Sequence, residues 1–139
     1  MGMCFLMFGF TGTLVLGDCR CERVLEGETT HWGGNEAIVD EQKPTLKVVQ
    51  GVVENAGMPL RSALVEVFVG WKYAPTGKKR VAACKTAEDG KFCFTNLRSG
   101  KYEIRSSIGK GWDVTHVLVT VDIKNGKDAS LDVAMQVAT

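Results

Sequence analysis

The feature that most constrains the fold of this chain is a series of short apolar segments between residues 46 and 139. The segments are rich in valine, isoleucine and phenylalanine, and in several of them these residues alternate with polar ones, a period of two that is that of a β-strand. Glycine, proline, asparagine and aspartate separate the segments and supply the backbone angles of turns. The segments are 46–54, 63–73, 79–87, 91–96, 101–108, 117–123 and 129–137. They predict an all-β, seven-stranded antiparallel β-sandwich with almost no helix.

The alternation also predicts which side chains lie in the core. Phe92 and Phe94 share one face of their segment, and their size favours the interior. In the next segment, Glu103 and Arg105 fall on the face opposite to the apolar residues. Asp89-Gly90 between two apolar segments predicts a hairpin. We therefore expect sheets with one buried face and one polar face.

Composition limits the function classes. A chain of 139 residues with 45% hydrophobic and 24% charged residues is typical of one folded domain. Seventeen basic and sixteen acidic residues give a net charge of +1, so no strong field attracts nucleic acid. We expect no nucleic-acid partner and no cofactor.

The amino-terminal part of the chain differs from the rest. Residues 1–17 carry no charge and are rich in Phe, Leu, Met and Gly, which predicts a signal peptide cleaved before Asp18, although a basic start is missing. The alternative is an apolar segment that the mature protein retains. Seventeen helical residues span only about 25 Å, so we expect no permanent transmembrane span. Residues 18–45 show no sustained period and predict an irregular arm before the domain at 46–139.

The cysteines support export, because removal of residues 1–17 leaves an even number. Cys84 and Cys93 flank the Asp89-Gly90 turn, so a bridge across the hairpin is one hypothesis and two unpaired thiols are the alternative. A bridge between Cys19 and Cys21 would be strained. We expect these two cysteines to link the arm to another chain or to the domain core. A metal group of Cys19, Cys21 and His31 is a weaker alternative, because no clear fourth ligand is present.

Five motifs in order give the segments a family resemblance. They are Val49-x-Gly51-x-Val53, Gly57-x-Pro59-Leu60, Ala63-x-Val65-x-Val67, Thr86-x-x-x-Gly90-x-Phe92-x-Phe94 and Leu97-x-x-Gly100-x-Tyr102. This region resembles the carboxypeptidase regulatory-like domains, which belong to the prealbumin-like (transthyretin-like) β-sandwiches. The resemblance implies a non-catalytic accessory domain. The matching residues are fold residues, so they carry architecture more than function.

Candidate catalytic residues are few. His116 has Ser106, Ser107 and Asp113 within ten residues, but none of them lies in a strained elbow or a glycine-rich oxyanion loop. We interpret His116 as a strand residue at the sheet surface and predict no enzyme activity.

Binding is a better prospect, because aromatic residues lie outside the expected core. They are Trp32, Trp71, Tyr73 and Trp112. Aromatic residues in loops are typical contact residues. Trp71, Tyr73 and Trp112 form one platform for a sugar or a protein if the end of segment 63–73 lies beside 109–111. Alternatively, they cap the ends of the sandwich.

These observations predict a secreted, periplasmic or cell-surface module that is non-catalytic and acts in binding or structure. Its arm and edge strands could assemble copies of the chain into an oligomer or a surface fibre. The alternatives are a carbohydrate-binding module and, less favoured, a small hydrolase or metal-binding protein.

Overall fold

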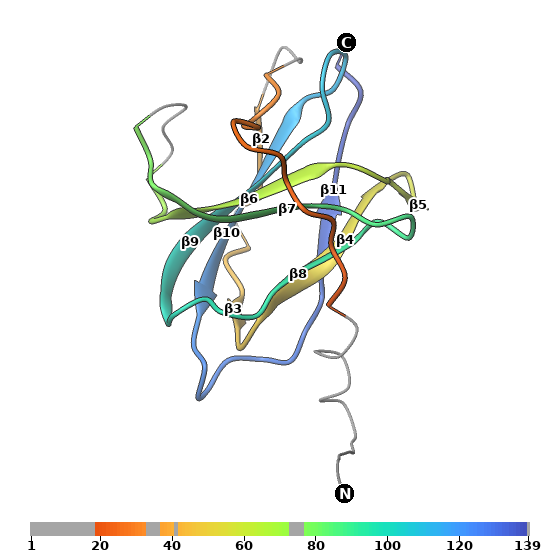
Figure 1. Ribbon diagram of the computed structural model, residues 1–139. Helices are drawn as coiled ribbons and strands as arrows, with labels where there is room; N and C mark the ends of the chain where they lie inside the picture. The colour runs from red at the N-terminus through yellow and green to blue at the C-terminus, as the bar shows by residue number, and fades with distance from the viewer. Residues whose placement is uncertain (1–18, 33–36, 41, 73–76, 139) are drawn as a thin grey trace, which may run out of the picture.

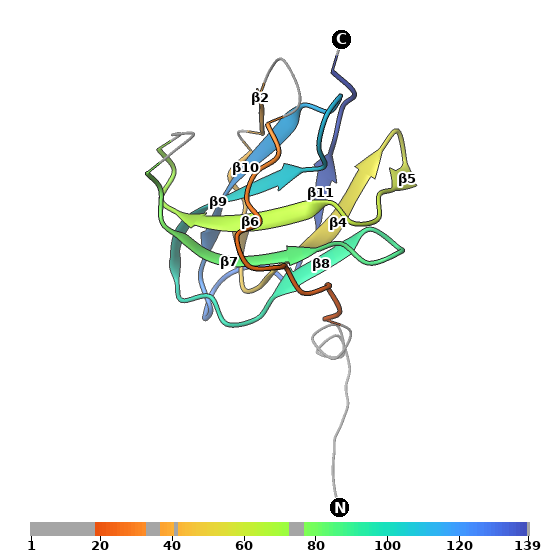
Figure 2. The same cartoon turned by 45° about the horizontal axis from the view of Figure 1, so that its top comes forward.

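The computed structural model describes residues 19–32, 37–40, 42–72 and 77–138. Two β-sheets pack face to face, as Figures 1 and 2 show, and no helix occurs in the described residues. The all-β sandwich predicted from the apolar segments is therefore confirmed. The predicted signal peptide at 1–17 and Tyr73 lie outside the described residues.

Each of the seven predicted segments overlaps a strand. These strands are β4 (Val49–Asn55), β6 (Leu64–Val69), β7 (Arg80–Lys85), β8 (Lys91–Phe94), β9 (Gly100–Ser107), β10 (Val114–Val121) and β11 (Leu131–Ala134). Three further strands were not predicted: β2 (Ala37–Asp40), β3 (Thr45–Leu46) and β5 (Met58–Pro59). Since β2 lies within 18–45, the predicted arm is not irregular throughout.

The larger sheet has the order β2-β10-β9-β6-β7, with β3 also paired to β10, and the smaller sheet contains β11, β4, β5 and β8. Most neighbours are antiparallel. However, β10 runs parallel to β2 and β3, and β11 runs parallel to β4. The sandwich was predicted to be antiparallel, and its two sheets are mixed, because side-chain alternation identifies a strand but does not identify the direction of its neighbour.

The turn at Asp89-Gly90 does not close a hairpin. Strand β7 pairs with β6 in the larger sheet, whereas β8 pairs with β4 in the smaller one. Gly90 has a φ of +76°, which glycine adopts without strain, and its carbonyl accepts the N–H of Val53. The turn therefore carries the chain from one sheet to the other.

The core lies between the two sheets. It contains side chains from the inward faces of both, including Val65, Ile104, Val119, Val133 and Phe92. Gly51 permits the close approach of β4 and β11, because a Cβ there would lie 2.9 Å from carbon atoms of Leu131. The inward faces predicted from the alternation of Tyr102 and Ile104 are confirmed by their burial.

The outer face of the larger sheet is also buried, contrary to the expectation of one polar, solvated face. Glu103, Arg105 and His116 are only 1%, 2% and 1% exposed. The interpretation of His116 as a surface residue was therefore wrong. The physical reason is that the chain folds back over this face, where Thr30 is itself buried and Trp32 lies beside the His116 ring.

Candidate functional site

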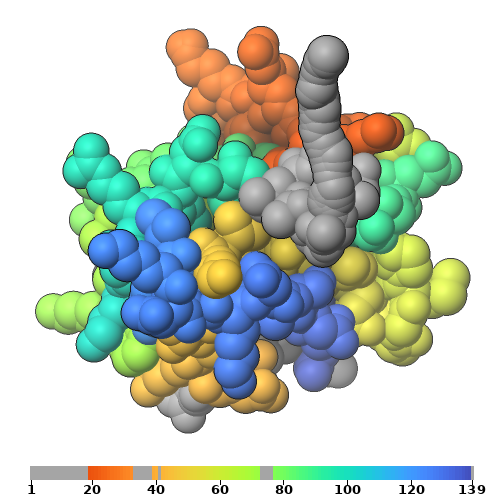
Figure 3. Space-filling model, turned by 90° about the horizontal axis from the view of Figure 1, so that it is seen from below, coloured from red at the N-terminus to blue at the C-terminus, as the bar shows by residue number. Residues whose placement is uncertain are grey.

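The candidate site is the covered outer face of the larger sheet together with residues 19–32. These residues are the first part of the predicted arm at 18–45, and from here on the name arm means residues 19–32 only. The arm crosses the strands instead of running along them, as the orange segment in Figures 1 and 2 shows. Along the arm, successive residues contact β8, β7, β6 and β9 in that order. Cys19 bonds to β8, Cys21 and Glu22 contact β7, Thr30 bonds to β6, and His31 bonds to β9. In the view of Figure 3 the arm lies on the outside of the molecule.

Two disulfides attach the arm to the sandwich. Cys19 pairs with Cys93 and Cys21 pairs with Cys84, with Cα–Cα distances of 5.4 and 5.7 Å. The four cysteines are thus disulfide-bonded, and the arm is linked to the domain core. The hypothesis of a Cys84–Cys93 bridge was wrong, because β7 and β8 do not form the expected hairpin and each cysteine pairs with one of the arm. Zinc and copper bind thiolates, so this pairing does not fit the alternative metal group with His31.

The disulfides give the arm one covalent bond to each sheet. Cys93 belongs to β8 of the smaller sheet and Cys84 to β7 of the larger sheet. Glu22 adds an antiparallel bridge to Lys85, whose ammonium also lies 2.8 Å from the Glu28 carboxylate. The hydrogen bond from Lys85, and a second from the Leu25 N–H, lower the pKa of Glu28. The arm therefore links the two sheets where β7 and β8 lie.

Glu103 is the centre of a buried charge network beyond the disulfides. Its carboxylate accepts hydrogen bonds from Lys78 Nζ at 2.7 Å and from Arg105 Nε at 2.9 Å, and it contacts His116 Nδ1. Burial acts to raise the pKa of Glu103. The hydrogen bonds from His116, Arg105 and Lys78 outweigh it and lower the pKa to about 2. Glu103 is therefore ionised at neutral pH although it is buried.

Glu66 is the second acid of this network. It is fully buried, and it accepts hydrogen bonds from Thr30 Oγ1 at 2.6 Å and from Arg80 Nη1 at 3.0 Å. Thr30 in turn accepts a hydrogen bond from Arg105 Nη1 at 3.3 Å. The arm thus supplies a hydroxyl that joins the two buried acids through Arg105.

Aromatic rings cover the guanidinium of Arg105 on the same face. The Cζ atom of Arg105 lies 4.1 Å from the centre of the Phe68 ring and 5.3 Å from the centre of the Trp32 ring. Trp32 is 47% exposed, so it forms the outer surface of the covered site. The guanidinium is therefore held by cation–π contacts as well as by Glu103.

The arrangement is not that of a nucleophilic enzyme. His116 Nδ1 contacts Glu103, and Ser107 Oγ accepts the N–H of His31. Ser106 lies next to Ser107 in β9 and faces the opposite side of the sheet. The described residues contain no group of three or more His, Cys, Asp or Glu side chains placed to hold a metal ion. The network can bind and orient charges, but its acids are neutralised by their own partners.

The other predicted aromatic residues do not come together. Trp71 donates its indole N–H to the Val119 carbonyl at 2.8 Å, whereas Trp112 precedes β10 and pairs with Val137. Seven residues of strand separate Val119 from Trp112, which is about 23 Å. The end of β6 lies beside the start of β9, because Val69 pairs with Tyr102, so it is far from 109–111. The structure therefore does not form the platform expected from Trp71 and Trp112.

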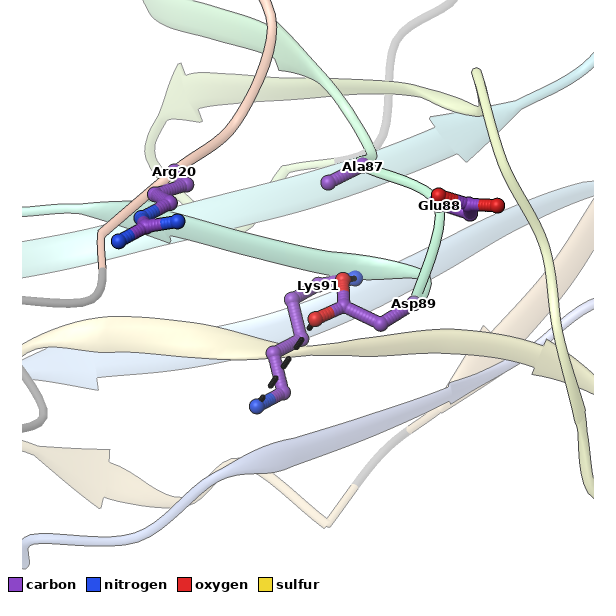
Figure 4. Close-up of a pocket in the computed structure, with 5 residues that line it drawn as sticks. All are labelled: Arg20, Ala87, Glu88, Asp89 and Lys91. Carbon is purple, nitrogen blue, oxygen red and sulfur yellow. Dashed lines mark hydrogen bonds and ion pairs between the residues drawn. The ribbon is translucent and has the colours of Figure 1, made fainter.

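A shallow hollow lies between the start of the arm and the turn from β7 to β8. Figure 4 shows its lining of Arg20, Ala87, Glu88, Asp89 and Lys91, around a volume of about 600 Å³. The charged lining residues are all exposed, and Lys91 and Asp89 lie 4.0 Å apart. This hollow lacks the buried polar groups of a built ligand site.

Sequence reasoning missed most of the network. Glu66 and Glu103 were present as charged residues in alternating strands, and that pattern ordinarily marks a solvated face. Lys78 and Thr30 carried no signal, since each belongs to a segment that is distant in sequence from its partner.

The described residues contain no helix that is long and apolar enough to cross a membrane.

The fold and the covered charge network define a β-sandwich module of the structural or protein-interaction kind. Residues 48–138 match the family model of the second β-sandwich domain of BOS complex subunit NOMO1-like proteins. The chain belongs to this family, which consists of non-enzymatic β-sandwich domains. The comparisons with curated proteins and with solved structures return no match. The family supports the sandwich class that the resemblance to carboxypeptidase regulatory-like domains implied.

Proposed function

We propose that the protein is an exported, non-catalytic module that assembles with further copies of itself through the edges of its larger sheet. The observation that carries this proposal is the position of β2 and β7 at the two opposite edges of that sheet. Among the described residues, the outer edge of β7 pairs only with Glu22, and no strand pairs with the outer edge of β2. Unpaired edges are the usual sites at which another chain adds a strand.

Head-to-tail pairing of β7 with β2 of the next copy continues the sheet and makes an open chain of molecules. Exposed apolar side chains lie at both edges, with Val81 on β7 41% exposed and Val39 on β2 45% exposed. One further finding supports a role in assembly: the family description names a subunit of a complex. The non-catalytic part of the proposal agrees with the sequence resemblance to carboxypeptidase regulatory-like domains, which implies an accessory role.

Export is supported by the disulfides. Bridges of this kind persist in oxidising compartments and are rare in a reducing cytosol. All four cysteines from Cys19 onward are paired within the chain. We therefore propose that the protein acts outside the cytosol, at a cell surface, in a periplasm or in a secreted form.

The substitution Ala83→Pro tests the assembly. Alternate residues of a strand direct their N–H groups to the same edge, so the N–H of Ala83 points outward like that of Lys85, which bonds to Glu22. Proline removes this outward donor and leaves the pairing with β6 intact. Light scattering over a concentration series should show association of the wild-type protein and at least tenfold weaker association of Ala83→Pro.

Ala83→Thr is the matched control, because it keeps the N–H and favours a strand. It should associate like the wild-type protein. A wild-type protein that stays monomeric at several hundred micromolar, or equal association of the proline and threonine variants, would contradict the proposal.

A further inference from the structure

We infer that the arm is a redox-operated cover, which a dithiol reductant releases from the charged face of the larger sheet while the sandwich stays folded. This inference does not depend on the proposed assembly. It rests on how the arm is attached, on what the arm covers, and on which sulfur atoms a reductant can reach.

The arm is attached mainly by covalent bonds and polar contacts. Its apolar side chains contribute little, since Leu25 is 68% exposed and Trp32 is 47% exposed. Of its residues, only Thr30 is buried. Burial of a large apolar side chain is worth about 2 kcal/mol, and the arm has almost none of it. Its noncovalent hold therefore consists of hydrogen bonds and a half-buried ion pair, of which the buried bond from Thr30 to Glu66 is the strongest and is worth about 1 to 2 kcal/mol.

The sandwich does not need the arm for its core. The buried core residues all lie between Leu46 and Met135, and only Cys21 of the arm packs against them, as a half-buried neighbour. Both disulfides join the arm to this self-sufficient core, and neither joins two core strands. Opening them therefore removes the covalent attachment of the arm and leaves the two sheets in contact.

The chemistry is thiol–disulfide exchange. Cys19 and Cys21 are half-buried, whereas Cys84 and Cys93 are buried, so a thiolate of the reductant reaches the arm sulfurs. Attack on Cys21 forms a mixed disulfide and releases the Cys84 thiolate, which takes up a proton. The second thiol of the reductant then displaces Cys21 as a thiol. One dithiol is oxidised to its disulfide for each protein disulfide reduced, and the exchange at Cys19–Cys93 follows the same balance.

Release of the arm exposes a specific surface. Thr30 leaves Glu66, the His31 N–H leaves Ser107, and Trp32 leaves the guanidinium of Arg105. These groups are then hydrated and open to a partner. The protein therefore has two forms. The arm covers the charged face in the oxidised form, and this face is exposed to solvent in the reduced form.

Hydrogen–deuterium exchange of the full chain tests this inference. Peptides covering 19–32 report on the N–H of Glu22, bonded to the Lys85 carbonyl at 2.7 Å, and on the N–H of His31, bonded to Ser107 Oγ at 3.0 Å. After incubation with dithiothreitol and alkylation of the thiols, exchange in the arm should be at least tenfold faster. Peptides from β9 and β10 should keep their protection.

The variant with Cys19, Cys21, Cys84 and Cys93 all replaced by Ser should reproduce the reduced pattern without any reductant. The matched control Thr30→Val keeps both disulfides and should leave the exchange of Glu22 unchanged. An arm that stays protected after reduction would show that noncovalent contacts hold it, and loss of protection in β9 and β10 would show that the sandwich needs the disulfides. Either result would overturn the inference.

Discussion

Glu103 illustrates how a buried charge is tolerated in this protein. Ionised carboxylates are expensive to bury unless their oxygen atoms are paired and hydrogen-bonded. Glu103 meets this condition through Lys78, Arg105 and His116, and Arg105 is further enclosed by Phe68. At the residue scale, stability on this face therefore depends on complete networks, and loss of one member leaves the others buried without compensation.

We predict that Glu103→Gln lowers the free energy of unfolding by about 3 kcal/mol or more, because it leaves Lys78 and Arg105 buried without their counter-charge. Urea unfolding at pH 7 measures the change. Glu88→Gln is the control, since Glu88 is exposed, and it should change stability by less than about 0.5 kcal/mol. Equal effects of the two substitutions would mean that the buried network contributes nothing.

At the scale of elements, the arm is an irregular segment that crosses the strands of the larger sheet. A strand added along an edge gains a ladder of backbone hydrogen bonds, but the arm has a single bridge of this kind, at Glu22 and Lys85. It relies instead on side-chain contacts to successive strands, and Thr30 makes the most buried of these. Each side-chain contact of the arm can therefore be tested almost independently of the others.

Thr30→Val should reduce the free energy of unfolding by about 1 to 2 kcal/mol. The substitution removes a donor from the buried Glu66 carboxylate and an acceptor from Arg105, while the side-chain volume stays nearly the same. Thr29→Val is a close control, because Thr29 is the neighbouring residue and is exposed. Thermal unfolding of the oxidised proteins distinguishes the two, and a control as destabilised as Thr30→Val would argue against the buried contact.

At the scale of the whole molecule, both faces of the larger sheet are buried. The inward face packs on the smaller sheet, and the centre of the outward face lies under the arm. The charge network therefore couples the stability of the fold to pH.

We predict that this coupling appears on the acid side. The pKa of Glu103 is lowered from 4.5 to about 2 in the folded protein, so its ionised form binds protons less readily there than in the unfolded chain. This difference contributes about 3 kcal/mol of stability, fully present above pH 4.5 and lost as the pH falls toward 2. Urea unfolding between pH 7 and pH 2 should show the loss, and Glu103→Gln should lose less stability over that range. A parallel fall in both proteins would assign the acid sensitivity to other groups.

Much of the architecture could be predicted from local patterns. Alternation and turn residues, which act over a few residues, account for the seven strand segments and for the core positions of Phe92 and Ile104. They also account for the absence of helix from the part of the chain that the structure describes. The strain of a Cys19–Cys21 bridge predicted that these cysteines pair elsewhere, but it left open whether with another chain or with the domain core. These features are local, so they can be read without knowledge of the neighbours.

The tertiary structure alone decided the sheet to which each strand belongs, the cysteine pairs and the buried charges. Cys19 meets Cys93 across 74 residues of chain, and Thr30 meets Glu66 across 36. A charged residue in a strand has the same local pattern whether water or another segment covers it. Only the path of the arm over β7, β6 and β9 converts Glu66, Glu103, Arg105 and His116 from expected surface residues into a buried network.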